Sequence, residues 1–177
     1  MAIRNIVELG DPALRKVCKP QEKFDLRLRV LLKDMADTMY KADGVGLAAP
    51  QVGILRRVVV IDVQDDHGLI ELVNPVITER SEETQCGREG CLSLPGRQGV
   101  VTRPMRVTVH AQDRHGHEFD LTGEGFLARA ICHELDHLDG RLWIDCADRE
   151  LTREEISGHI PEDGDEPEEE ETEGEEA

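Results

Sequence analysis

The chain has 177 residues, a length that predicts one domain, and a formal net charge of −17. Residues 162–177 hold 11 acidic residues and no Lys or Arg, and subtracting those acids leaves −6. The rest of the chain shows no basic excess typical of nucleic-acid-binding proteins, no apolar signal segment at its start, and no apolar stretch long enough to span a membrane. We therefore expect a cytoplasmic protein that has no direct nucleic-acid-binding motif and does not enter a membrane.

The first part of the chain predicts an irregular arm followed by a helix. Residues 1–24 carry turn signals such as Gly10-Asp11-Pro12. Residues 26–41 repeat Leu and Met at helical spacing, Asp25 precedes them as an N-cap, and Gly44 follows them. This pattern predicts an amphipathic N-terminal helix.

The middle of the chain predicts two strands between irregular segments. Residues 44–51 are rich in Gly and Ala and predict an apolar loop. Residues 57–62 and 69–76 are rich in β-branched side chains, which predicts strands. Residues 84–99 contain several glycines, two cysteines and a proline, so we expect a loop or an irregular edge segment there.

The last part of the chain predicts a hairpin and then a second helix. Residues 105–112 alternate in polarity and can pair with residues 117–121. Residues 122–139 predict a helix that ends at Gly140. Strands followed by a late helix and joined by short hairpins favour an α+β fold over a doubly wound sheet. We expect small antiparallel or mixed sheets around this central helix.

The end of the chain differs from the rest in composition. Residues 161–177 are strongly acidic, of low complexity, and almost without apolar side chains. Such a segment repels itself and buries too little apolar surface to fold, so we expect a disordered tail behind a domain of residues 1–160. The simplest interpretation of the tail is a solubilising segment without a specific partner.

A motif of metal-binding type, His133-Glu-Leu-Asp-His137, lies late in the predicted second helix. Positions i and i+4 share one face of a helix, so the two histidines can bind one metal ion. Glu134 lies beside them and is a candidate general base. The alternative is a surface helix with two titrating histidines.

A catalytic metal site needs a third protein ligand and one open position. An upstream candidate is Cys91, which follows Gly90, a residue that permits unusual backbone angles. We favour Cys91, because one thiolate and two imidazoles leave a position for water. The downstream candidates are His159, Glu150, Glu154 and Glu155.

The chain has five cysteines and no Cys-x-x-Cys pair, which in a reducing compartment favours free thiols or metal ligands over disulfides. Cys132 adjoins His133 but points about 100° away from it, since a helix has 3.6 residues per turn. The other three are expected to be inert: Cys18, Cys86 and Cys146.

Three blocks can now be taken together: Gly44-Val-Gly-Leu-Ala-Ala-Pro-Gln51, Glu89-Gly-Cys-Leu-Ser-Leu-Pro95 and His133-Glu-Leu-Asp-His137. In order and spacing they resemble the three signature motifs of the peptide deformylase family, and the resemblance covers residues 3–148. It implies that residues 1–160 form an α+β metallohydrolase of protein biosynthesis. Such an enzyme removes the N-formyl group from the formylmethionine of newly synthesised polypeptides and releases formate.

The resemblance also implies the roles of the metal site. Cys91, His133 and His137 would bind the ion, and Glu134 would act as general acid and base. Fe²⁺ is implied as the native ion, with Zn²⁺, Ni²⁺ or Co²⁺ able to replace it. A bound divalent ion lowers the pKa of its water from 15.7 to roughly 7, which makes a nucleophile available at neutral pH.

Further roles implied by the resemblance concern the substrate. The side-chain amide of Gln51 and the backbone N–H of Leu92 would stabilise the developing oxyanion, and backbone groups around Val45 and Gly46 would pair with an extended peptide. Arg97 stands one position before the substrate-contacting Arg of some members, so we leave it out of the site. Arg103 is expected to be structural.

The side chain of the substrate methionine needs an apolar slot. Phe126 and Ala130 precede His133 by seven and three residues and share its helix face, so with Val45 opposite they could line that slot. The alternative is that Phe126 belongs to the ordinary core. Arg129 is expected to extend into solvent.

The expected partners are N-formylmethionyl nascent peptides. Some members of the family carry a basic C-terminal helix that docks on the ribosome, whereas the tail of this chain is acidic. The acidic tail argues against docking through such a helix, but a transient association with the ribosome is still expected.

Two other functions are compatible with the residues alone. A zinc-dependent peptidase or amidase would use the same ligands and would need room on both sides of the scissile bond. A binding module with a structural metal would need four protein ligands and could dispense with Glu134.

Overall fold

The computed structural model describes residues 2–158, so the acidic tail expected over residues 161–177 and the candidate ligand His159 lie outside the described residues. No helix of the described part is long and apolar enough to cross a membrane. The helices are η1 (Pro12–Arg15), α1 (Leu26–Lys41), η2 (Ala49–Val52), α2 (Phe126–Leu138), η3 (Trp143–Asp145) and α3 (Arg153–Ser157). The strands are β1 (Gly46–Ala48), β2 (Val58–Ile61), β3 (Ile70–Arg80), β4 (Thr84–Cys91), β5 (Leu94–Pro104), β6 (Arg106–Gln112), β7 (Glu118–Glu124) and β8 (Arg149–Glu150).

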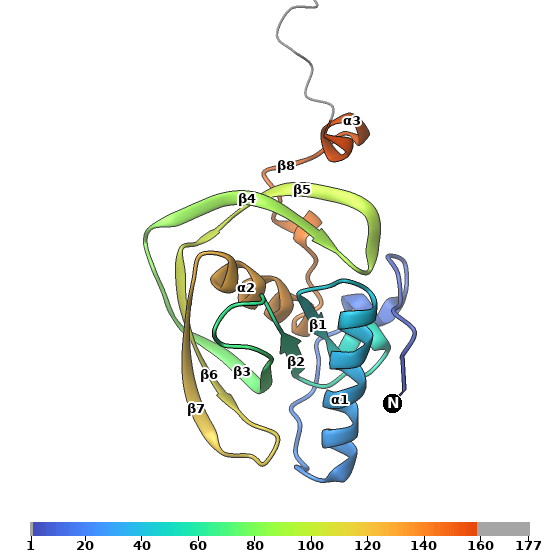
Figure 1. Ribbon diagram of the computed structural model, residues 1–177, viewed down its shortest axis with the longest axis vertical. Coiled ribbons are helices and arrows are strands. Elements are labelled where there is room, and N and C mark those ends of the chain that lie inside the picture. The colour runs from blue at the N-terminus through green and yellow to red at the C-terminus, as the bar shows by residue number, and fades with distance from the viewer. Residues whose placement is uncertain (1, 159–177) are drawn as a thin grey trace, which may run out of the picture.

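The strands form two small antiparallel sheets. The larger sheet has the order β1-β2-β3-β6-β7, and the smaller has the order β4-β5-β8. Figure 1 shows the β4–β5 hairpin arching over α2, while the larger sheet curves around the other side of that helix. The expected α+β class with small antiparallel sheets is confirmed.

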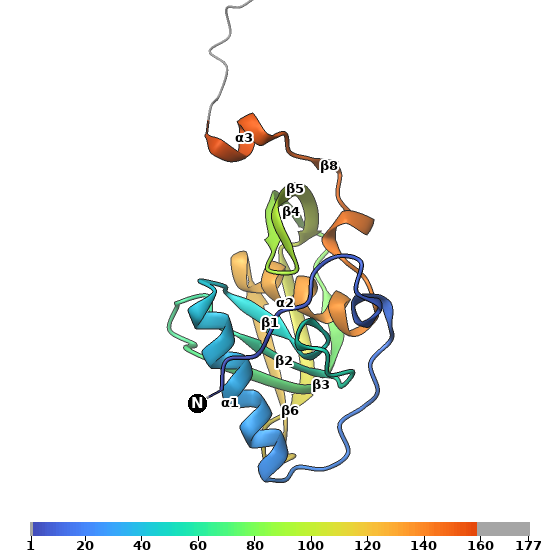
Figure 2. The ribbon, with the colours of Figure 1, turned by 90° about the vertical axis from the view of Figure 1, so that its right-hand side faces the viewer.

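The larger sheet separates two apolar layers, and β2 shows why. Its four residues are all apolar and fully buried, which is typical of a strand covered on both faces. Val58 and Val60 pack into the cluster under α1, whereas Val59 and Ile61 pack into the cluster around α2. Since side chains alternate across a strand, one short segment joins both cores. Figure 2 shows α1 and α2 with β1 and β2 between them.

The helix α2 is enclosed on nearly every side. Eleven of its 13 residues are buried, which is expected of a helix that contacts both sheets. Gly123 of β7 allows a close approach, because a Cβ there would lie 2.8 Å from Leu127 Cγ and 2.9 Å from Ile131 Cδ1. The central helix is therefore packed tightly between the two sheets.

Two of the expected loops and one expected helix boundary were wrong. The loop expected over residues 44–51 contains β1 and η2, and the segment 84–99 forms most of the β4–β5 hairpin. Glycines hide the alternation of that hairpin, because they stand where the strands pack closely on Arg129 and Trp143. The second helix begins at Phe126 and not at 122, since residues 122–124 continue β7 in register with β6.

The hairpin yields a prediction about stability. A Cβ at Gly99 would overlap the Trp143 ring and lie 2.9 Å from the Arg149 carbonyl oxygen. Gly99→Ala should therefore lower the free energy of unfolding by about 1–3 kcal/mol, measured by denaturant unfolding of the metal-free protein. Gly90→Ala is the matched control, because its Cβ would meet its nearest neighbour at 3.4 Å. Equal stability of both variants would contradict this packing.

Candidate metal centre

The structure brings three of the candidate ligands together from two elements. Cys91 ends β4, while His133 and His137 lie one turn apart on α2. Their ligand atoms all lie within 4.8 Å of one another, and Cys91 Sγ is 3.4 Å from His137 Nε2. Within residues 2–158 this is the one group of three such side chains close enough to share an ion.

The spacing of these atoms fits a metal ion. A tetrahedral ion about 2.3 Å from sulfur and 2.0–2.1 Å from nitrogen places the two donor atoms about 3.5 Å apart. The observed separation of 3.4 Å agrees with that value. Three protein ligands leave a fourth position for water or substrate, which is the pattern of a catalytic site.

Several other carboxylates and cysteines of the described residues do not belong to this group. Two of the downstream carboxylates, Glu150 and Glu155, form ion pairs with Arg97 and Arg149 instead. Burial raises the pKa of both the Cys18 and the Cys132 thiol to about 11, which keeps them protonated. The remaining two cysteines, Cys86 and Cys146, are exposed.

A buried carboxylate that the sequence reasoning missed, Glu89, orients the first histidine. Its Oε2 lies 2.9 Å from His133 Nδ1, and Arg103 donates to both of its oxygens at 2.8 and 3.0 Å. Burial by itself would raise the pKa of Glu89, but the hydrogen bonds from Arg103 and His133 lower it to about 2. An ionised Glu89 accepts a hydrogen bond from the Nδ1–H group of His133. This hydrogen bond leaves the Nε2 atom of His133 free to bind a metal.

A signal for Glu89 was present in the sequence. Residues i and i+2 of a strand lie on the same face, so Glu89 must accompany Cys91 toward the helix once residues 84–91 are known to form a strand. Because a loop was expected over residues 84–99, Glu89 was not predicted to face the helix.

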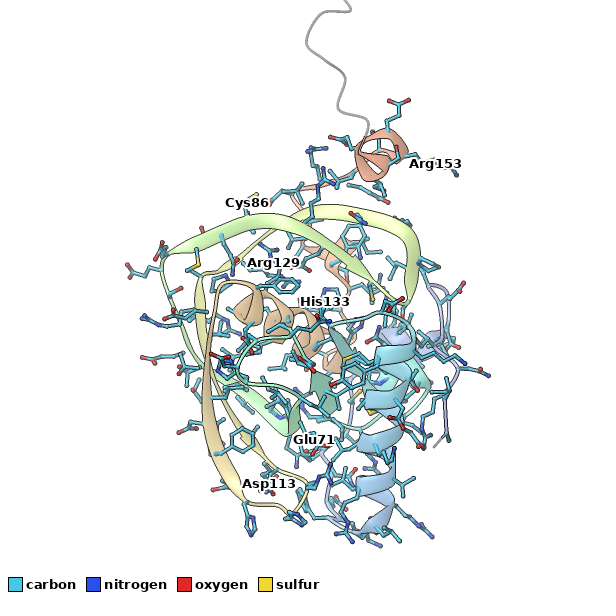
Figure 3. All side chains as sticks on the ribbon, viewed as in Figure 1. Glu71, Cys86, Asp113, Arg129, His133 and Arg153 are labelled. Atoms are coloured by element: carbon cyan, nitrogen blue, oxygen red, sulfur yellow. The ribbon has the colours of Figure 1, made fainter. Side chains whose placement is uncertain are left out.

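The expectation that Arg129 extends into solvent was wrong. Its guanidinium is buried, and NH1 donates at 2.9 Å both to Glu89 Oε1 and to the Val101 carbonyl oxygen. Figure 3 shows Arg129 and His133 on the side of α2 that faces the hairpin. The ionised carboxylate and the strand carbonyls draw the arginine inward. Arg103 has a structural position, as expected, between Glu89 and Asp136.

Glu134 is buried beside the candidate ligands and has a free oxygen. Its Oε2 has no hydrogen-bond partner among the described residues. Burial raises the pKa of Glu134 to about 7, against the lowering effect of His133. The carboxylate lies against Gly46, where any Cβ would collide with it. The backbone of β1 and the acid are therefore in direct contact, and this acid can exchange a proton near neutral pH.

Gln51 and the edge of β1 complete the site. Gln51 Oε1 accepts from the Ala48 N–H at 2.9 Å, and Nε2 points to Cys91 Sγ at 3.4 Å. Among the described residues the strand β1 pairs with β2 alone, so no strand of that part of the chain covers its other edge. Leu92 packs close to Gly44 across the mouth of the site.

A cavity of about 500 Å³ opens onto these groups. Phe126 is 54% exposed, so the alternative that it belongs to the ordinary core was wrong. Arg97 lines the rim and is held there by Glu150 at 2.6 and 2.9 Å. His137 is buried behind the cavity wall and does not line it. The walls include the other expected site residues: Val45, Gly46, Gln51, Cys91, Leu92, Phe126, Ala130, His133 and Glu134.

Comparison with known proteins agrees with this geometry. The family model described as polypeptide deformylase matches residues 3–153. A peptide deformylase of Caldicellulosiruptor bescii is 57% identical over 156 residues, which cover 88% of this chain and 92% of the relative.

Two solved structures are also similar. A Thermotoga maritima peptide deformylase has a TM-score of 0.81 at 43% identity, covering 84% of this chain and 99% of that one. A Synechococcus elongatus peptide deformylase in complex with actinonin has a TM-score of 0.79 at 40% identity, covering 88% and 83%.

Glu89→Gln tests the link between the buried carboxylate and the metal ligand. Every partner of Glu89 is a donor, so an amide NH₂ there would face another donor. Metal affinity should fall by roughly 10- to 100-fold, measured by competition with a chelator. Glu82→Gln is the control, because Glu82 is exposed in the turn that precedes β4. This substitution should leave the metal affinity unchanged. Unchanged affinity in both variants would exclude this role of Glu89.

Proposed function

Because this chain belongs to the peptide deformylase family, which removes the formyl group from N-terminal methionine, we propose which of its residues carry out that hydrolysis. It is a metal-dependent hydrolase of protein biosynthesis. The observation that carries the proposal is the convergence of Cys91, His133 and His137 beside the buried Glu134.

The proposed ligands are Cys91 Sγ and the Nε2 atoms of His133 and His137. We propose Fe²⁺ as the native ion, with Zn²⁺, Ni²⁺ or Co²⁺ as substitutes, since one thiolate and two imidazoles accept all four. When bound, the ion polarises the formyl oxygen and lowers the pKa of a water molecule. The thiolate offsets one positive charge of the ion and so lowers its Lewis acidity. A weaker Lewis acid suits a formyl carbon, because this carbon is more electrophilic than that of a peptide carbonyl.

Glu134 is the proposed general acid and base. Its unpartnered Oε2 can accept the proton of the attacking water, and the same oxygen can return that proton to the leaving amine. Glu134 lines the cavity and is otherwise buried, so its carboxylate can pass the proton directly between the water and the leaving amine.

Two donors are proposed for the oxyanion of the tetrahedral intermediate. The Gln51 amide approaches from the η2 side, and the Leu92 N–H lies next to Cys91 in the connection between β4 and β5. Donors held in place before the reaction stabilise charge as it develops, and losing one typically costs about 10²–10³ in rate.

The substrate is proposed to bind along β1. An extended peptide can add to the free edge at Val45 and Gly46, as strands add to any open sheet edge. The methionine side chain would then enter the apolar part of the cavity, lined by Val45, Phe126 and Ala130. We propose that the enzyme acts on nascent chains in the cytoplasm, where transient association with the ribosome would raise the local concentration of substrate.

Glu134→Gln tests the assignment of the general base. The substitution keeps size and removes the proton acceptor, so formate release from formyl-Met-Ala should fall by roughly 10²–10⁴ with near-normal metal content. Glu154→Gln, on the exposed face of α3, is the matched control and should keep the wild-type rate. Wild-type activity in metal-replete Glu134→Gln protein would refute the role.

The thiolate ligand yields a prediction about air. Iron-loaded enzyme should lose activity in air, and a reductant should slow the loss, because a ferrous ion and its thiolate are both open to oxidation. Zinc-loaded enzyme should keep its rate, since Zn²⁺ has no redox chemistry. Mass spectrometry should find added oxygen at Cys91 before the buried Cys18. An iron enzyme that survives aeration with an unmodified Cys91 would contradict the thiolate ligand.

A further inference from the structure

A buried hydroxyl, Ser93 Oγ, lies against the side-chain amide of Gln51. Gln51 Nε2 donates to Ser93 Oγ at 3.1 Å, and Ser93 is fully buried. The two residues come from different elements, since Gln51 lies in η2 and Ser93 connects β4 to β5. The contact therefore joins the two segments that carry the proposed oxyanion donors.

The hydrogen bonds of Gln51 determine which way its amide faces. Oε1 accepts from the Ala48 N–H at 2.9 Å, so Nε2 must lie on the opposite side. Nε2 carries two hydrogens. One is directed at Ser93 Oγ, and the other points to Cys91 Sγ at 3.4 Å, toward the candidate metal position. Each end of the amide is thus held by a separate partner.

Without Ser93 the amide would have more freedom. The terminal torsion of a Gln side chain has a broad energy profile, so one bond at Oε1 leaves the direction of the two N–H groups loosely defined. A second bond at Nε2 restricts that torsion. It keeps the other N–H on the side of Cys91 Sγ and the candidate metal position before substrate arrives.

The N-terminal arm holds the same two segments together through the backbone. The Val7 N–H donates to the Gln51 carbonyl oxygen at 2.8 Å, and the Leu9 N–H donates to the Ser93 carbonyl oxygen at 2.9 Å. N–H groups two residues apart lie on the same edge of an extended chain. One edge of the arm therefore spans both segments and keeps Gln51 and Ser93 at a constant separation.

We propose that Ser93 is a positioning residue for the hydrolysis: its hydroxyl accepts one hydrogen of the Gln51 amide and so directs the other at the developing oxyanion. This inference rests on the proposed role of Gln51. It assigns Ser93 no contact with substrate or metal. Its effect should therefore appear in the rate of the chemical step and should depend on Gln51.

The test is a double-mutant cycle on zinc-loaded, full-length enzyme with formyl-Met-Ala as substrate. Ser93→Ala should lower kcat by roughly tenfold, less than the 10²–10³ expected for removing a donor outright. KM and zinc content should stay unchanged, because the amide acts on the transition state. In the Gln51→Ala background, Ser93→Ala should have no further effect on kcat, since the group it positions is gone.

Two further variants separate positioning from general loss of structure. Ser93→Thr keeps the hydroxyl and should retain most of the rate. Thr38→Val removes another buried hydroxyl, which donates to the Asp34 carbonyl oxygen far from the site, and should change stability without changing kcat. An equal loss of kcat from Ser93→Ala in both backgrounds, or a loss that follows zinc content, would overturn the proposal.

A measurement on the wild-type enzyme covers the case in which Ser93→Ala does not fold. The Nε2 hydrogens of Gln51, assigned in NMR spectra by comparison with Gln51→Ala, should exchange slowly with water, because one of them is held by the buried Ser93 Oγ. Fast exchange of both hydrogens with water would overturn the proposal. Failure of the proposed function would be recognised differently, as a metal-replete wild-type enzyme that releases no formate.

Discussion

The geometry of the site depends on the hydrogen bonds of one buried carboxylate, that of Glu89. It joins β4 to α2, the two elements that supply the candidate ligands, through His133, Arg103 and Arg129. Cys91 follows Glu89 by two residues and ends the same strand, so the contact of Glu89 with α2 also brings the sulfur near the helix. A sheet that rested on α2 through apolar packing alone would leave the distance between thiolate and imidazoles loosely defined.

The charges around Glu89 balance. Two carboxylates, Glu89 and Asp136, face the two guanidinium groups of Arg103 and Arg129. Removing charges from water costs several kcal/mol for each ion, and close pairing offsets that cost only when the geometry is good. Here Arg103 of the hairpin donates to Asp136 of α2, and Arg129 of α2 donates to Glu89 of the hairpin. The network therefore links the hairpin to the helix by directional hydrogen bonds.

Glu134, one residue from His133, has the opposite environment. It faces the glycine of β1 and, within residues 2–158, has no cationic partner like those of Glu89. Burial therefore raises the pKa of Glu134, whereas hydrogen bonds lower the pKa of Glu89. Two buried carboxylates close together thus differ in pKa: that of Glu89 is lowered and that of Glu134 is raised. The difference follows from what each acid faces, which is the arginines and His133 for Glu89 and the backbone of β1 for Glu134.

The sequence by itself determined the features that depend on the spacing of nearby residues along the chain. Two histidines four residues apart on a helix must share a face, an acid next to them must lie near, and three motifs in order were enough to indicate the family. Family membership also excludes the alternatives of a peptidase and of a structural metal. The α+β class followed from the order of strands and the late helix.

What only the tertiary structure decided were the contacts between residues 40 or more positions apart along the chain. Gln51 meets Ser93, and Arg129 meets Glu89, because sheet register and helix placement bring them together. The contacts depend on how the strands pair, which the sequence does not show directly. The glycines that allow β4 and β5 to pack closely also interrupt the alternation of polar and apolar residues that would have predicted a strand. Spacing along the chain can show which side chains share an element, but only packing between elements selects the partner of a buried charge.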